Sequence, residues 1–206
     1  MKKLMLAVFA VFALSAASFA GGWGVGVKLG VGQNDPKGMK ENWEFLGGTL
    51  TKSGAYFALE GLYEWDLGGE TLDEVGSANK LGLRFGLEGY GENKLEVPGL
   101  GSEEESTGAL PISVYYKRDG GIKAPSFYVG GGMTYISTTI SATGVSDEDK
   151  DKLFPHIMGG VEYRFTKLFA LGLDLKYNIG AKVKKNGFVM SDRSGLQGAL
   201  AARFYF

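Results

Sequence analysis

The sequence contains no cysteine and only one histidine, His156, among its 206 residues. The lack of cysteine excludes a disulfide framework, a zinc–thiolate site and a lipid anchor on cysteine. There is also no excess of positive charge, because 22 Lys and Arg residues are balanced by 23 Asp and Glu residues. Nucleic-acid-binding proteins carry a basic stripe or patch, so we expect no nucleic-acid partner.

The longest apolar run lies at the N-terminus and has the features of an export signal. Two lysines precede an apolar stretch over residues 4–17, and small residues follow up to Ala20. A transmembrane anchor is the alternative, but the run is shorter than the roughly 20 apolar residues that a spanning helix needs. We therefore expect a signal peptide at residues 1–20, cleaved after Ala20, and one mature domain at residues 21–206.

The rest of the chain offers no second stretch suited to a transmembrane helix. Its longest uncharged segment, residues 124–146, is interrupted by Pro125 and by glycines at 130–132. Glycine is abundant, at 34 residues, but it forms neither collagen triplets nor a Gly/Ser tract. If this chain enters a bilayer, it does so as β-strands.

Eight segments alternate apolar residues with small or polar residues at every second position. A period of two is typical of a strand whose two faces meet different surroundings. The segments are residues 23–32, 56–65, 80–88, 110–117, 127–135, 156–165, 169–178 and 197–206. This pattern predicts an all-β fold, an eight-stranded antiparallel up-and-down β-barrel.

The connections between these segments alternate in length. Short ones at 118–123 and 166–167 contrast with long polar ones at 32–54, 91–108, 137–152 and 179–195. Long and short connections on opposite rims are typical of outer-membrane barrels. The 66–79 connection is long for its rim, and we have no physical account of it. Pro111 deletes a donor from the hydrogen-bond ladder, so we expect it near a rim.

Periodicity alone does not separate a membrane barrel from a soluble barrel with an apolar interior, such as a lipocalin. The face opposite the apolar one is rich in glycine and alanine and carries single charges, which suits a narrow filled interior. Aromatic residues also gather at segment ends, as in the belts that meet lipid headgroups. The predicted belts contain Trp23, Tyr63, Trp65, Tyr116, Phe127, Phe165 and Phe169 at one rim, with Tyr135 and Tyr177 at the other. We therefore predict a transmembrane barrel.

The face predicted to point inward carries twelve charged residues. They are Lys28, Glu60, Glu64, Lys80, Arg84, Glu88, Lys117, Glu162, Arg164, Asp174, Lys176 and Arg203. An eight-stranded barrel is just wide enough for side chains to fill, and buried charges need partners. We expect these residues to form ion pairs that plug the lumen. The alternative is a narrow ion path with a charged lining.

Several stretches resemble the OmpA/OmpX-type small outer-membrane barrels. They are Phe127-Tyr-Val-Gly-Gly-Gly, Val161-Glu-Tyr-Arg-Phe and the final Arg203-Phe-Tyr-Phe206. The resemblance implies a location in the bacterial outer membrane, contact with its lipid and lipopolysaccharide, and four long surface-exposed loops. It also implies that Leu200, Ala202, Phe204 and Phe206 form the signal read by the barrel-assembly machinery. The role it implies is structural or one of surface interaction, with an unknown ligand at the loops.

Catalysis and ion binding find little support in the sequence. Outer-membrane enzymes that act on lipid A use histidine with serine, whereas His156 has no His-x-Ser pattern because residue 158 is Met. The acidic run 147–151 lacks the glycine and the closing glutamate of a calcium loop, so we expect no metal or other cofactor. Lys182, Lys184 and Lys185 are candidates to meet lipopolysaccharide phosphates. A small channel, a lipid A-modifying enzyme and a soluble lipocalin-like carrier remain the alternatives to a non-enzymatic barrel.

Overall fold

The computed structural model describes residues 21–32, 49–51, 53–67, 78–99, 101–142, 148–185 and 188–206. The predicted signal peptide, most of the 66–79 connection and part of the acidic run lie outside these residues. In the described part of the chain, no helix is long and apolar enough to cross a membrane.

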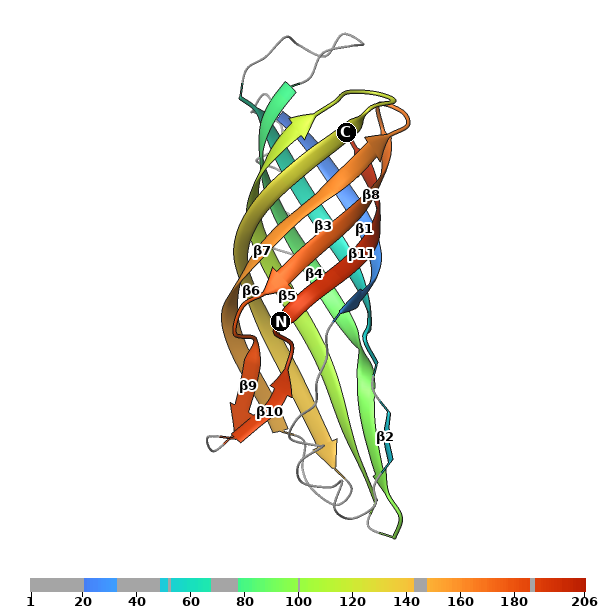
Figure 1. Cartoon of the computed structure of the whole chain (residues 1–206), viewed down its shortest axis with the longest axis vertical. Helices are drawn as coiled ribbons and strands as arrows, with labels where there is room; N and C mark the ends of the chain where they lie inside the picture. Colours follow the sequence, from blue (N-terminus) through green and yellow to red (C-terminus); the bar gives the residue numbers. More distant parts are fainter. Residues whose placement is uncertain are drawn as a thin grey trace.

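Eight strands form the closed wall of a barrel (Figure 1). They are β1 (Gly21–Gly32), β3 (Ala55–Asp66), β4 (Ala78–Val97), β5 (Gly101–Asp119), β6 (Pro125–Ala142), β7 (Glu148–Arg164), β8 (Phe169–Asn178) and β11 (Gly195–Tyr205). Each pairs antiparallel with the next wall strand, and β11 pairs with β1 to close the ring. This confirms the predicted eight-stranded antiparallel barrel, and each predicted segment falls on one wall strand.

Three shorter strands lie outside the wall. β2 (Thr49–Thr51) pairs with the far part of β4, while β9 (Lys182–Lys185) and β10 (Phe188–Asp192) form a separate hairpin. The barrel thus has two unlike ends, which we call the short-turn end and the long-hairpin end. Figure 1 shows the short turns at the top and the β4–β5 and β9–β10 hairpins at the bottom.

Two of the predicted long connections are largely strand. β4 and β5 pair through residues 91–108, apart from a reversal at Pro98 and Gly99, and β6 and β7 pair through most of 137–152. The apolar alternation stops there because outward positions carry Lys, Glu, Ser and Thr. Beyond a bilayer the outer face of a strand meets water instead of lipid, so the strand continues without the hydrophobic period.

The two faces of the wall differ as the alternation predicted. Val25, Leu29 and Leu173 on the outer face expose 44%, 67% and 46% of their surface. Ala170 and Asp174, which point inward, expose 0% and 6%. The apolar side chains therefore cover the outside of the barrel and the polar ones fill the inside.

Glycine makes room for large inward side chains in this narrow interior. A Cβ atom on Gly82 would overlap the Tyr115 ring, and one on Gly132 would overlap the carbonyl oxygen of Ile112. Pro111 is accommodated in a related way, because a Cβ on Gly86 would lie 3.1 Å from its ring. Pro111 lies well inside β5, not near a rim as predicted, and the β4–β5 pairing lapses beside it.

Candidate functional site in the barrel interior

Arg203 on β11 lies at the centre of the interior and is fully buried. Its Nε donates to Glu60 at 2.5 Å, its Nη1 to Glu162 at 3.2 Å, and its Nη2 to both Asp174 oxygens at 2.6 and 2.7 Å. The three carboxylates come from β3, β7 and β8. One guanidinium therefore connects four strands across the lumen.

Two more cations complete this group. Lys28 Nζ lies 2.6 Å from Glu60 and 2.7 Å from Asp174, and Arg84 lies 3.5 Å and 3.1 Å from the same two carboxylates. We call Lys28, Glu60, Arg84, Asp174 and Arg203 the central cluster. Each of its two carboxylates contacts three cations, and together its members come from five strands.

Tyrosines line the central cluster. The Tyr128 hydroxyl donates to Asp174, and the Arg84 guanidinium stacks 4.7 Å from the Tyr128 ring and 4.8 Å from the Tyr115 ring. Tyr115 in turn donates to Glu64 at 2.9 Å. Aromatic faces attract buried cations, so these rings fill space and add electrostatic stabilisation.

A second group of charges lies toward the short-turn end. Lys117 Nζ lies 3.0 Å from Glu64 and 2.9 Å from Glu162, while Lys80 and Arg164 lie 3.0 Å and 3.5 Å from Asp119. Asp119 was assigned by sequence to the short 118–123 connection, but it is the last residue of β5 and is fully buried. Asp119 comes two residues after the inward-pointing Lys117, so the alternation of β5 also places Asp119 on the inward face.

A third group lies toward the long-hairpin end. Lys176 Nζ contacts both Glu88 oxygens at 2.6 and 2.7 Å, and Tyr90 Oη donates to Glu88 at 2.6 Å. Farther out, Arg193 lies 3.2 Å from Glu105, and both side chains are almost fully buried. This pair was not predicted, because both residues fall in predicted loops. Counting back in twos from Ser113 on β5 would have placed Glu105 on the inward face.

All twelve charged residues predicted to point inward are thus in ion pairs with one another or with Asp119. Ion pairs connect Asp119, through Lys80, Glu64, Lys117 and Glu162, to Arg203 in the central cluster. Among the described residues, no ion pair joins Glu88 and Lys176 to this series. A cavity of about 30 Å³ lies between this pair and the central cluster, lined by Lys28, Glu88, Lys176 and other residues. This is room for one or two water molecules.

His156 lies between two hydroxyl groups in the same interior. Its Nε2 is 2.8 Å from Ser113 Oγ, and its Nδ1 is 2.8 Å from Thr134 Oγ1. The contact of Ser113 with His156 was not predicted, because Ser113 lies on β5, which does not adjoin β7 in the wall. Catalytic serine–histidine pairs place a carboxylate on the second ring nitrogen; here, among the described residues, a threonine occupies that place. The described residues also include no group of three His, Asp or Glu side chains able to hold a metal ion.

The predicted aromatic residues lie on the outer face at the strand ends. At the short-turn end, Tyr63 packs edge-on against Trp23 at 4.8 Å and Trp65 at 4.6 Å, and this contact buries it. Phe165 and Phe169 stack 6.0 Å apart at the same rim, where Phe127 is exposed and Tyr116 Oη donates to Asn79 at 2.6 Å.

Toward the long-hairpin end, Tyr135 and Tyr177 are exposed on the outer face. Tyr135 Oη donates to Asp151 at 2.5 Å, and this hydrogen bond lowers the pKa of the exposed Asp151 carboxyl. Leu200 and Phe204 on β11 are exposed, as is Phe206 directly after the strand, and Ala202 lies between Leu200 and Phe204 on the same outer face.

The sequence matches the family described as "Outer membrane protein beta-barrel domain" over residues 4–204. The chain belongs to this family. Its members are proteins of the bacterial outer membrane, so the exposed apolar face of the barrel faces lipid, as predicted. Among curated proteins, none matches this sequence.

Solved structures of small outer-membrane barrels resemble the fold. Ail, the attachment invasion locus protein of Yersinia pestis, has a TM-score of 0.52 at 12% identity, covering 91% of this chain and 100% of Ail. The N-terminal barrel of Pseudomonas aeruginosa OprF has a TM-score of 0.45 at 14% identity, covering 89% and 97%. Neisserial surface protein A has a TM-score of 0.44 at 15% identity, covering 91% and 98%. Ail has also been solved with the heparin analogue sucrose octasulfate.

Proposed function

We propose that this protein is a non-enzymatic outer-membrane barrel whose lumen is closed by its own side chains and whose long-hairpin end serves surface interactions. The central cluster is the observation that supports a closed lumen most strongly. Five strands contribute to it, and its two carboxylates contact three cations each. A passing ion would have to separate buried charges, which is costly in a low-dielectric interior.

Single-channel recording in planar bilayers tests this closure. The refolded protein is expected to give no steady conductance steps. The double variant Glu60→Ala/Asp174→Ala removes both central carboxylates, so we expect steps to appear in it. Its matched control is Glu96→Ala/Glu104→Ala, which removes two exposed carboxylates of the β4–β5 hairpin and is expected to stay silent. Steady, reproducible steps from the unaltered protein would contradict closure and support the small channel.

The orientation in the membrane is the second part of the proposal. Outer-membrane barrels place short turns in the periplasm and long loops outside. An epitope inserted between Pro98 and Gly99, at the tip of the β4–β5 hairpin, should bind antibody on intact cells. One inserted between Gly120 and Gly121, in a short turn, should bind only after permeabilisation. The reverse pattern would contradict this orientation.

The absence of catalysis is also a proposal, and it is supported by the position of His156. This side chain faces the lumen and exposes 2% of its surface, so it does not reach an acyl ester in the surrounding lipid. The His156→Ala variant should therefore leave lipid A unchanged by mass spectrometry. A change in lipid A acylation that depends on His156 would show that the protein is an enzyme.

We propose two partners in the envelope and one processing step. Lipopolysaccharide would meet the lysines of β9 at the long-hairpin end, and replacing Lys182, Lys184 and Lys185 by Gln should lower the amount that copurifies. The barrel-assembly machinery would read Leu200, Ala202, Phe204 and Phe206. Cleavage after Ala20 predicts Gly21 as the first residue of the protein isolated from the outer membrane.

The ligand of the long-hairpin end is the open part of this proposal. Ail, which shares the fold, has been solved with a sulfated heparin analogue, so sulfated glycans are a reasonable first class to test. Retention on a heparin column that falls with added salt and with loss of the β9 lysines would support this class. Absence of retention at low salt would exclude it.

A further inference from the structure

The β9–β10 hairpin is attached to the barrel but is not part of its wall. The pairing of β8 with β11 ends at Asn178 and Gly195, and β9 and β10 pair only with each other in the described structure. Gly180 and Gly195 flank the hairpin with φ of +64° and +124°. Glycine adopts such angles without steric cost. Both connections to the wall therefore turn at a glycine, which directs the hairpin away from the line of the wall.

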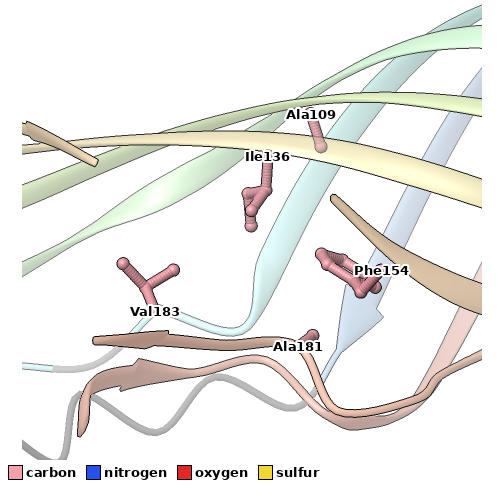
Figure 2. Close-up of a cluster of buried hydrophobic side chains, with 5 residues drawn as sticks. All are labelled: Ala109, Ile136, Phe154, Ala181 and Val183. Atoms are coloured by element: carbon pink, nitrogen blue, oxygen red, sulfur yellow. The ribbon is translucent and has the colours of Figure 1, made fainter. Parts of the chain in front are cut away.

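The apolar underside of the hairpin covers part of the mouth of the barrel. Ala181 and Val183, each 2% exposed, pack against Ala109, Ile136 and Phe154 from β5, β6 and β7 (Figure 2). These contacts join the hairpin to three wall strands other than β8 and β11, to which it is covalently attached. The apolar contacts are non-directional and separate without breaking a covalent or ladder connection. Lys152 on β7 adds two hydrogen bonds, from its Nζ to the carbonyl oxygens of Gly180 and Lys182 at 2.9 and 2.8 Å.

Arg193 adds a polar anchor beside this apolar contact. Its Nη2 donates to Glu105 at 3.2 Å and to Thr107 at 2.8 Å, and its guanidinium lies 4.6 Å from the Tyr90 ring. The closed position is thus held by two specific hydrogen bonds and by contact with an aromatic face.

We propose that the β9–β10 hairpin is a lid over the lumen, hinged at Gly180 and Gly195 and latched by Arg193. This lid is distinct from the closure by the central cluster, because it controls access to the part of the lumen between that cluster and the long-hairpin end. Thr138 lies in that part, is 0% exposed and contacts Thr107, the residue to which Arg193 is bonded. Opening the lid gives solvent access to Thr138, while the central cluster below stays intact.

A single cysteine reports on the opening, because the chain has none of its own. The refolded Thr138→Cys protein is treated with a charged methanethiosulfonate reagent, and the rate of modification is measured. Adding Arg193→Ala should raise this rate at least tenfold, and Arg193→Lys should give a smaller increase. The matched control is Lys94→Ala, which removes an exposed charge from the β4–β5 hairpin at the same end of the barrel and should leave the rate unchanged. Equal rates with and without Arg193 would overturn the latch.

Hydrogen exchange provides a second measurement on the protein without a cysteine. Amides of β9 and β10 should exchange at least tenfold faster in Arg193→Ala, while those of β8 keep their protection. Protection of the hairpin equal to that of β8 in both proteins would show that it is a fixed part of the barrel. If Arg193→Ala fails to give the heat-modifiable band of a folded barrel, Thr107→Val removes one of the two acceptors and tests the same latch.

Discussion

Arg203 is fully buried and donates hydrogen bonds to three carboxylates, so replacing it by methionine is a severe test of the interior. The substitution keeps much of the side-chain volume but removes the bonds to Glu60, Glu162 and Asp174. Breaking a buried ion pair from one side costs about 3–5 kcal/mol. Each carboxylate here keeps at least one cation, namely Lys28 and Arg84 for two of them and Lys117 for Glu162.

We therefore expect Arg203→Met to lower the free energy of unfolding by about 3 kcal/mol, at the lower end of that range. Urea unfolding in lipid vesicles, followed by tryptophan fluorescence, measures this change. With an m-value of ~1–3 kcal/mol/M, the midpoint should fall by roughly 1–3 M. The control is Arg118→Met, which removes an exposed arginine from β5 and should cost no more than about 0.5 kcal/mol.

The double variant Arg203→Met/Asp174→Asn separates electrostatics from packing. It removes a negative charge as well as the positive one, so it should cost less than the sum of the two single variants. Strictly additive costs would mean that the two side chains do not interact. A cost for Arg203→Met below about 1 kcal/mol would refute the view that the central cluster holds the barrel together.

Three further variants test packing, orientation and assembly. Gly82→Ala should lower the free energy of unfolding by about 1–3 kcal/mol, because the added methyl group displaces the Tyr115 ring. Gly89→Ala, which has open space around it, is the control and should be nearly neutral. Equal effects of the two variants in urea titrations would contradict this. Leu173→Arg, on the lipid face, should cost about 2–4 kcal/mol in the same titrations, and a neutral result would place this face away from lipid. Phe206→Ala should reduce the amount of heat-modifiable barrel in outer-membrane fractions, and unchanged assembly would show that the terminal ring is not read.

The wall of the barrel could be predicted from the sequence because a bilayer imposes two different faces on each strand. Leu171, Leu173 and Leu175 on β8 had to face lipid, and this requirement made the period of two visible. The inward charges followed from the same alternation. The interior residues could therefore be predicted without knowing which strands lie opposite one another.

The long-hairpin end could not be predicted in this way. Beyond the lipid the hydrophobic period disappears, and although counting in twos along β5 places Glu105 inward, nothing in the sequence pairs it with Arg193, 88 residues away. The contact between Ser113 and His156, which flank Gly132 of β6, was missed for a similar reason, because the alternation assigns a face but not a partner. Pro111 was misplaced because the β4–β5 pairing lapses beside it and Gly86 leaves room for its ring, and the alternation reveals neither feature.

A spin-label scan along β8 tests the central claim most directly. Single cysteines at positions 170–177 carry the label, and collisions with oxygen, which enters lipid, and with a water-soluble nickel chelate are measured. Labels at 171, 173 and 175 should meet oxygen, while those at 170, 172, 174 and 176 should meet neither reagent, because the interior is filled by side chains. Oxygen contact at 174 and 176 would show that these positions face lipid, which contradicts the assignment of the two faces. Nickel contact at the same positions would show a water-filled lumen.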